Sequence, residues 1–146
     1  MKKKSENRGE QIMILIACVD DHMGMQFNHR RQSQDRILRE HILNKFNGTK
    51  IWMNQYSAKQ FGEHENINID DDYFSKAAPK DICFVEDRSV APYAHLISKI
   101  ILYKWNRIYP SDLFFDIPLS REWHLIATED FSGSSHDKIT EEIYTK

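Results

Sequence analysis

The chain has 146 residues, of which 40% are hydrophobic and 12% aromatic, and this predicts one globular domain with a packed core and excludes global disorder. The formal net charge is −2, so no overall positive charge favours nucleic acid or an anionic membrane as a partner. The two cysteines, Cys18 and Cys83, each lie inside an apolar run, which predicts buried thiols in a cytoplasmic protein rather than a disulfide.

The first eleven residues are polar and include three consecutive lysines. We expect residues 1–11 to form a flexible tail and residues 12–146 to form a single domain. The apolar stretch 12–19 is too short to span a bilayer and ends at two aspartates, so we expect a buried strand here and no membrane segment.

Strands and helices are predicted to alternate along most of the chain. Residues 13–19 read as a central strand covered on both faces, residues 20–34 as a long polar loop, and residues 35–46 as a helix with apolar side chains at helical spacing. The next elements are strands at 50–53, 67–69, 82–85 and 99–105, and helices at 56–61, 70–77 and 92–97.

The chain ends in two strand-like runs, 123–131 and 138–144, joined by a loop of serine and glycine that favours a hairpin. Alternating strands and helices indicate a parallel sheet with crossover connections. The predicted fold class is therefore α/β: a single domain with a mostly parallel sheet, flanking helices and a C-terminal antiparallel hairpin.

This order of elements resembles the dihydrofolate reductase family. The resemblance is carried by residues 14–25 (ILIACVDDHMGM), by the strand 99–103, and by residues 111–116 (SDLFFD), which are similar to the family's Gly-Asp-x-x-Phe-Pro stretch. It covers roughly residues 13–144 and implies that family's fold. It also implies a catalytic role for Asp35, at the position of the carboxylate that binds the pterin and assists its protonation. Capping of the helix explains the same residue without a ligand.

The segments that hold the nicotinamide dinucleotide in that family depart from its pattern. The family's Gly-Gly pair after the strand 82–85 is replaced by EDR at 86–88, and its Gly-Arg-x-Thr turn by MNQY at 53–56. Carboxylates repel phosphate, and side chains fill the space that glycines leave open. We therefore expect no cofactor of this kind.

Residues 27–36 (FNHRRQSQDR) and 133–136 (GSSH) resemble small bacterial proteins that carry the label ribonuclease Z. That enzyme needs a two-zinc His-x-His-x-Asp-His cluster, and none of the seven histidines forms a His-x-His pair. Cys-x-x-Cys and His-Glu-x-x-His motifs do not occur either, so we expect no metal site.

Two groups of residues are candidates for binding a small ligand. Arg30, Arg31 and Ser33 offer hydrogen bonds to a phosphate or carboxylate, although a solvated charged loop accounts for them as well. Trp105 and Arg107 follow a predicted strand at the end where open α/β sheets bind ligands. Trp105 is suited to stack on a ring and Arg107 to hold an anion; the alternative for Trp105 is core packing.

His136 is the second catalytic candidate, because an imidazole titrates near neutral pH and can act as a general acid or base. Its neighbours Ser134, Ser135 and Asp137 also have the composition of a turn, and a catalytic triad is defined by geometry rather than by proximity in sequence.

The sequence favours a diverged dihydrofolate reductase-like protein that binds a small anionic or heterocyclic ligand without the nicotinamide cofactor. One alternative is an RNA-binding protein or a metal-independent phosphodiester hydrolase. In it, the arginines would bind the phosphodiester backbone of the RNA, and His29 or His136 would be the acid or base. Another is a partner-binding domain that has lost its ligand. The sequence decides neither whether the protein is catalytic nor its oligomeric state.

Overall fold

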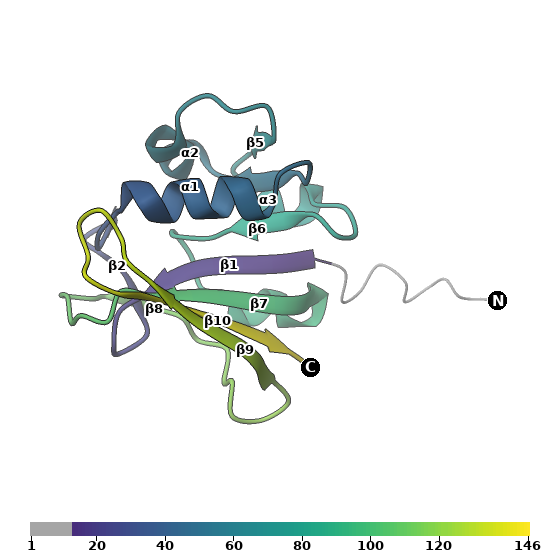
Figure 1. Cartoon of the computed structure of the whole chain (residues 1–146). Helices are drawn as coiled ribbons and strands as arrows, with labels where there is room; N and C mark the ends of the chain where they lie inside the picture. The colour runs from purple at the N-terminus through teal and green to yellow at the C-terminus, as the bar shows by residue number, and fades with distance from the viewer. Residues whose placement is uncertain (1–12) are drawn as a thin grey trace.

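The computed structural model describes residues 13–146, and the flexible tail expected for residues 1–11 lies outside them. Its main feature is a seven-stranded sheet in the order β5-β4-β6-β1-β7-β10-β9 (Figure 1). No helix in the described part of the chain is long and apolar enough to cross a lipid bilayer.

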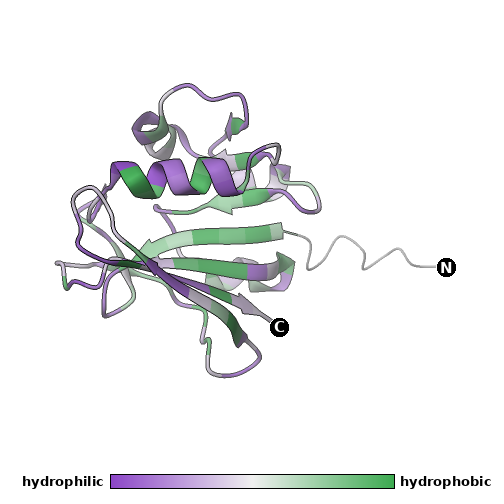
Figure 2. Ribbon diagram, viewed as in Figure 1, coloured by the Kyte–Doolittle hydropathy of each residue, from purple (hydrophilic) through white to green (hydrophobic). Residues whose placement is uncertain are grey.

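The centre of the sheet is β1 (Met13–Val19), which pairs in parallel with β6 (Ile82–Phe84) on one side and β7 (Ile97–Lys104) on the other. Side chains of β1 alternate between two hydrophobic clusters, with Leu15 in one and Ile16 in the other. The continuous apolar run of this strand is explained by burial of both faces, and Figure 2 shows the hydrophobic colour along β1 and much of β7.

The sheet is extended on both sides of these strands. On one side lie the parallel strands β4 (Ile51–Met53) and β5 (Ile67–Ile69). On the other, β10 (Ile139–Thr145) runs antiparallel to β7 and forms a hairpin with the edge strand β9 (His124–Phe131). The predicted α/β fold class, with its mostly parallel sheet and antiparallel C-terminal hairpin, is confirmed.

Helices cover both faces of the sheet. Buried side chains of α1 (Arg36–Lys45) and α2 (Gln55–Phe61) belong to the cluster around Ile16. Those of α3 (Tyr73–Lys76) belong to the cluster around Leu15, and the 3₁₀ helix η2 (Ala91–Leu96) packs against that second cluster.

A second, three-stranded sheet corrects the prediction of a polar loop at residues 20–34. It consists of β2 (Gly24–Phe27), β3 (Arg30–Arg31) and β8 (Leu113–Phe114) in the order β3-β2-β8. Asn28 and His29 both have positive φ, 54° and 62°, which is the conformation of a type I′ two-residue hairpin turn. These strands are too short for an alternating pattern to be visible in the sequence.

Candidate functional site

Loops that follow the carboxyl ends of β1 and β7 are joined by the carboxylate of Asp20. This fully buried side chain accepts hydrogen bonds from the backbone N–H groups of His22 and Gly24, both at 2.8 Å, and of Tyr109 at 3.0 Å. Burial alone would raise the pKa of Asp20, but the N–H donors outweigh burial and lower it. Asp20 therefore fixes Tyr109 beside the β2–β3 hairpin.

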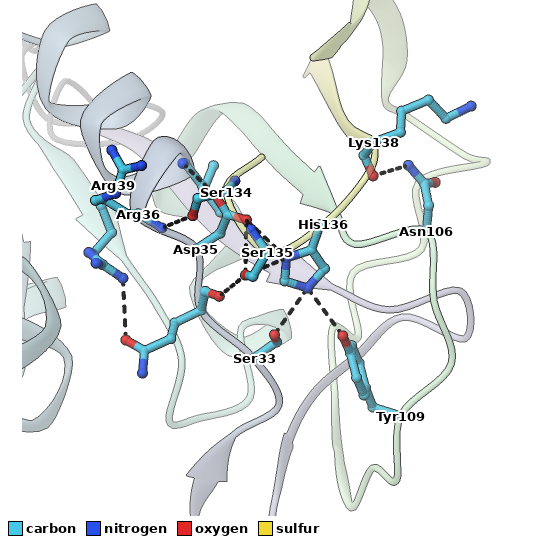
Figure 3. Close-up of polar contacts among 12 residues, drawn as sticks. Ser33, Asp35, Arg36, Arg39, Asn106, Tyr109, Ser134, Ser135, His136 and Lys138 are labelled. Atoms are coloured by element: carbon cyan, nitrogen blue, oxygen red, sulfur yellow. Dashed lines mark hydrogen bonds and ion pairs between the residues drawn. The ribbon is translucent and has the colours of Figure 1, made fainter. Parts of the chain in front are cut away.

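Asp35 caps α1 and also holds the loop between β9 and β10. Its Oδ1 accepts from the N–H groups of Leu38 (3.1 Å) and Ser134 (2.9 Å), and its Oδ2 from the N–H of Ser135 (2.8 Å). The Nδ1 atom of His136 lies 3.0 Å from the same Oδ2 (Figure 3). Helix capping, the alternative considered for Asp35, is thus present together with a contact to His136.

The surroundings of Asp35 determine the proton positions on His136. Burial opposes ionisation, but the N–H groups of Ser134 and Ser135 and the imidazole hold the pKa of Asp35 far below its usual range. An ionised carboxylate only accepts hydrogen bonds, so His136 Nδ1 must carry a proton and donate a hydrogen bond to Asp35. When the imidazole is neutral, Nε2 on its opposite edge carries the lone pair.

Two hydroxyl groups face that lone pair. Ser33 Oγ and Tyr109 Oη each lie 3.1 Å from His136 Nε2 (Figure 3). The indole of Trp105 stacks on the imidazole, with 4.5 Å between ring centroids. Trp105 is also 3% exposed, so it takes part in core packing and in the site. Of the residues predicted from the sequence, Ser33, Asp35, Trp105 and His136 are brought together.

The three predicted arginines do not converge. Arg31 turns toward the main sheet, where its guanidinium donates to both carboxylate oxygens of Glu86 and to the carbonyl oxygen of Tyr56. Arg30 and Arg107 are both exposed. Arg30 is on β3, whereas Arg107 follows β7.

Two cavities lie beside these residues. The first is partly open to solvent, has a volume of about 270 Å³ and lies between the β2–β3 hairpin and the segment after β7. Its lining residues are Phe27, Asn28, Arg30, Arg31, Gln32, Tyr109 and Pro110. The second, of about 330 Å³, is lined by Trp105, Asn106, Arg107, Asp137 and Lys138. The predicted ligand-binding arginines thus divide between two cavities, and we call the first the hairpin cavity.

Two carboxylates, the buried Glu86 and the half-buried Asp87, follow β6 in the segment where the sequence departs from the glycine pattern. Glu86 is 6% exposed and accepts from the hydroxyl of Ser57 and the carboxamide of Gln60, besides Arg31. Its neighbour Asp87 accepts from the Tyr73 hydroxyl at 2.6 Å. Protein groups therefore satisfy both carboxylates.

A third carboxylate caps the start of η2. Asp116 Oδ1 accepts from the backbone N–H groups of Val90 (3.0 Å) and Ala91 (2.9 Å), and its Oδ2 contacts the hydroxyl of Ser89. The amides at the beginning of this helix are already bonded to an anion of the chain itself.

Among residues 13–146, no group of three or more His, Cys, Asp or Glu side chains is arranged to hold a metal ion.

Sequence reasoning missed the contributions of Tyr109 and Asp116 to these contacts. Tyr109 is 27 residues from His136, and Asp116 is 25 residues from Ala91. Neither pair belongs to a motif of fixed spacing, so nothing in the sequence connects them. The Asp35–His136 pair, separated by 101 residues, was predicted only as two independent candidates.

Comparison with known proteins supports the fold but no closer relationship. No protein-family model matches the chain, and no curated protein sequence matches it. Among solved structures, it is similar to dihydrofolate reductase from Enterococcus faecalis complexed with NADP(H) and RAB-propyl. The TM-score is 0.66 at 12% sequence identity, and the alignment covers 92% of this chain and 96% of that one. The chain therefore has the dihydrofolate reductase fold.

Proposed function

We propose that this protein binds a small, planar, anionic ligand in the hairpin cavity and does so without a nicotinamide dinucleotide. The observation that carries the proposal is the composition of that cavity, in which the exposed Arg30 stands with the aromatic rings of Phe27 and Tyr109. An arginine and two aromatic rings match a ligand with a carboxylate or phosphate on a flat ring.

The location of the hairpin cavity supports this function. It lies next to segments that follow the carboxyl ends of β1 and β7, where open α/β sheets bind their ligands. The ion pair between the partly buried Arg31 and the buried Glu86 anchors the hairpin that forms one wall. A volume of about 270 Å³ suits a single heterocycle or a mononucleotide better than a dinucleotide.

Three carboxylates argue against the cofactor named for the Enterococcus structure, NADP(H). Glu86 and Asp87 stand where the family has glycines. Asp116 already accepts the hydrogen bonds of the first backbone N–H groups of η2. Glu86 is already paired with Arg31, and Asp87 with Arg88, so a phosphate entering here would have to displace these internal ion pairs and hydrogen bonds. The residues present do not fit a dinucleotide, so no hydride transfer is assigned to this chain.

Thermal unfolding with added ligand tests the proposal. Ligands at ten times their Kd raise stability by about 1.4 kcal/mol, equivalent to a Tm increase of about 4 °C for a chain of this size. We expect such an increase with folate or GMP and no increase with NADPH. Arg30→Gln should require at least ten times more ligand for the same Tm increase. Arg121→Gln, a control at another exposed arginine, should leave the required concentration unchanged.

The opposite results are equally informative. Stabilisation by NADPH would overturn the cofactor part of the proposal, and an undiminished response in Arg30→Gln would remove the hairpin cavity as the binding site. Stabilisation that appears only with short RNA, grows with its length and falls steeply with salt would favour the RNA-binding alternative instead.

A further inference from the structure

We propose that Ser33, His136 and Asp35 form a catalytic relay in which Ser33 is the nucleophile for hydrolysis of a small carboxylic ester. This activity goes beyond ligand binding, and its three relay residues do not line the hairpin cavity. Its basis is the chain of contacts from Asp35 Oδ2 to His136 Nδ1 at 3.0 Å and from His136 Nε2 to Ser33 Oγ at 3.1 Å. These are the distances that join acid, base and nucleophile in a serine hydrolase.

The relay is held rigidly on its acid side. Asp35 is 2% and His136 4% exposed, and the N–H groups of Leu38 and Ser134 prevent the carboxylate from turning away. Gly133 allows the loop to approach this closely, because a Cβ atom there would lie 2.4 Å from Asp35 Oδ2. The imidazole is thus fixed in the tautomer that a general base requires.

Ser33 is distinguished from the other serines near the imidazole by the edge that it faces. Ser135 Oγ lies 3.2 Å from Nδ1, the nitrogen that carries the proton, and donates its own hydrogen bond to the Asp35 carboxylate or the Gln34 carbonyl. Ser33 faces the basic Nε2 and is partly exposed. It alone among these serines combines access to substrate with access to the base.

Tyr109 supplies a second hydroxyl with a different role. The Nε2 atom has one lone pair, so it accepts the proton of one hydroxyl at a time. When Ser33 donates to Nε2, the Tyr109 hydroxyl is available to donate to the developing oxyanion of the substrate. Tyr109 also lines the hairpin cavity, which connects the relay to a space for substrate.

The reaction balances with water as the only co-reactant. Ser33 Oγ forms a bond to the acyl carbon and its proton passes to His136 Nε2. The bond between the acyl carbon and the alcohol oxygen breaks, and the leaving alcohol takes that proton. Water then adds to the acyl-Ser33 ester through the same base, and release of the carboxylic acid returns the proton to Ser33.

Active-site labelling tests whether Ser33 is a nucleophile. A fluorophosphonate probe should modify the full chain once, and mass spectrometry of peptides should find the adduct on Ser33. Ser33→Ala should abolish labelling, whereas Ser120→Ala, at another exposed serine, should not affect it. Ser33→Ala leaves the Asp35–His136 contact intact, so its loss of labelling would not come from misfolding; circular dichroism checks this.

Turnover of p-nitrophenyl acetate provides a second measurement. We expect a burst of one equivalent of p-nitrophenolate per chain and at least a 100-fold lower kcat in Ser33→Ala. Tyr109→Phe should keep labelling at Ser33 but lower kcat about tenfold or more. Folded wild-type protein that is not labelled, or labelling that persists in Ser33→Ala, would overturn the proposal. Arg30→Gln should still be labelled, so this result is independent of the ligand site.

Discussion

At the scale of single residues, Glu141 shows how strongly this fold depends on buried carboxylates. It lies on β10, is 2% exposed, and accepts from Tyr103 Oη at 2.7 Å, His41 Nε2 at 2.9 Å and Lys45 Nζ at 3.1 Å. Burial would raise the pKa of Glu141, but these three donors lower it to about 2.

We expect Glu141→Gln to lower the free energy of unfolding by about 3 kcal/mol at neutral pH, since an amide cannot replace the ionised acceptor. Because the folded-state pKa is depressed, the stabilisation is complete above the unfolded-state pKa and disappears as pH falls toward 2. Urea unfolding at several pH values measures the difference between the proteins, which should shrink with acidity. Glu129→Gln, on the exposed edge strand, is the control; an equal effect there would contradict the explanation.

The contacts at this scale explain what the sequence revealed about the candidate site. His136 and Asp35 were recognisable as chemically capable residues, because imidazole and carboxylate chemistry belongs to the residue type. Their pairing depends on the β9–β10 loop reaching the start of α1, and no local pattern encodes a contact across 101 residues. The sequence shows the arginines as one cluster. Arg30 and Arg31 are adjacent on β3, however, and Arg30 is exposed whereas Arg31 is partly buried.

At the scale of elements, Arg31 is one of the side chains that tie the β2–β3 hairpin to the main sheet. Arg31 stacks over the Tyr56 ring, with its guanidinium carbon 4.2 Å from the ring centroid, and reaches Glu86 beyond β6. We expect Arg31→Met to loosen the hairpin without unfolding the protein, since Glu86 keeps Ser57 and Gln60 as donors.

Hydrogen exchange measures that loosening. Amides of β2 and β3 should exchange at least tenfold faster in Arg31→Met, equivalent to about 1.4 kcal/mol of local stability, while those of β1 and β7 keep their protection. Arg30→Met on the same strand should leave hairpin exchange unchanged. Uniformly faster exchange throughout the sheet would mean instead that Arg31 stabilises the whole fold.

The elements also differ in how well the sequence predicted them. The runs of β1 and β7 were recognisable because both faces are buried, and α1 because Leu38 and Ile42 recur at helical spacing. The hairpin of β2 and β3 was missed, as its strands have four and two residues. Its turn depends on positive φ at Asn28 and His29, which these residue types permit without requiring.

At the scale of the whole molecule, depressed carboxylate pKa values predict acid sensitivity. Donated hydrogen bonds outweigh burial and lower the pKa of several carboxylates in different parts of the fold, namely Asp20, Asp35, Asp87, Asp116 and Glu141. Each therefore stabilises the fold above its unfolded-state pKa, and the stabilisation is lost as pH falls through the folded-state value.

We expect the Tm to be nearly constant between pH 7 and 5 and to fall steeply below about pH 4.5, where unfolded carboxylates begin to take up protons. Differential scanning calorimetry across pH 7 to 3 measures this profile. The slope of Tm against pH below pH 4.5 should be shallower in Glu141→Gln, because this variant has one fewer carboxylate whose protonation is coupled to unfolding. A Tm that stays level down to pH 3 would show that these carboxylates are not coupled to folding.

The contact between Asp35 and the β9–β10 loop also constrains when the molecule can fold. The bond from Asp35 to Leu38 spans three residues and forms as soon as α1 forms, whereas those to Ser134 and Ser135 span about a hundred. The central strand β1 likewise obtains its partner β7 only after some eighty intervening residues. A nascent chain therefore carries an uncovered central strand until most of it has left the ribosome, and its native structure forms late and in one cooperative step.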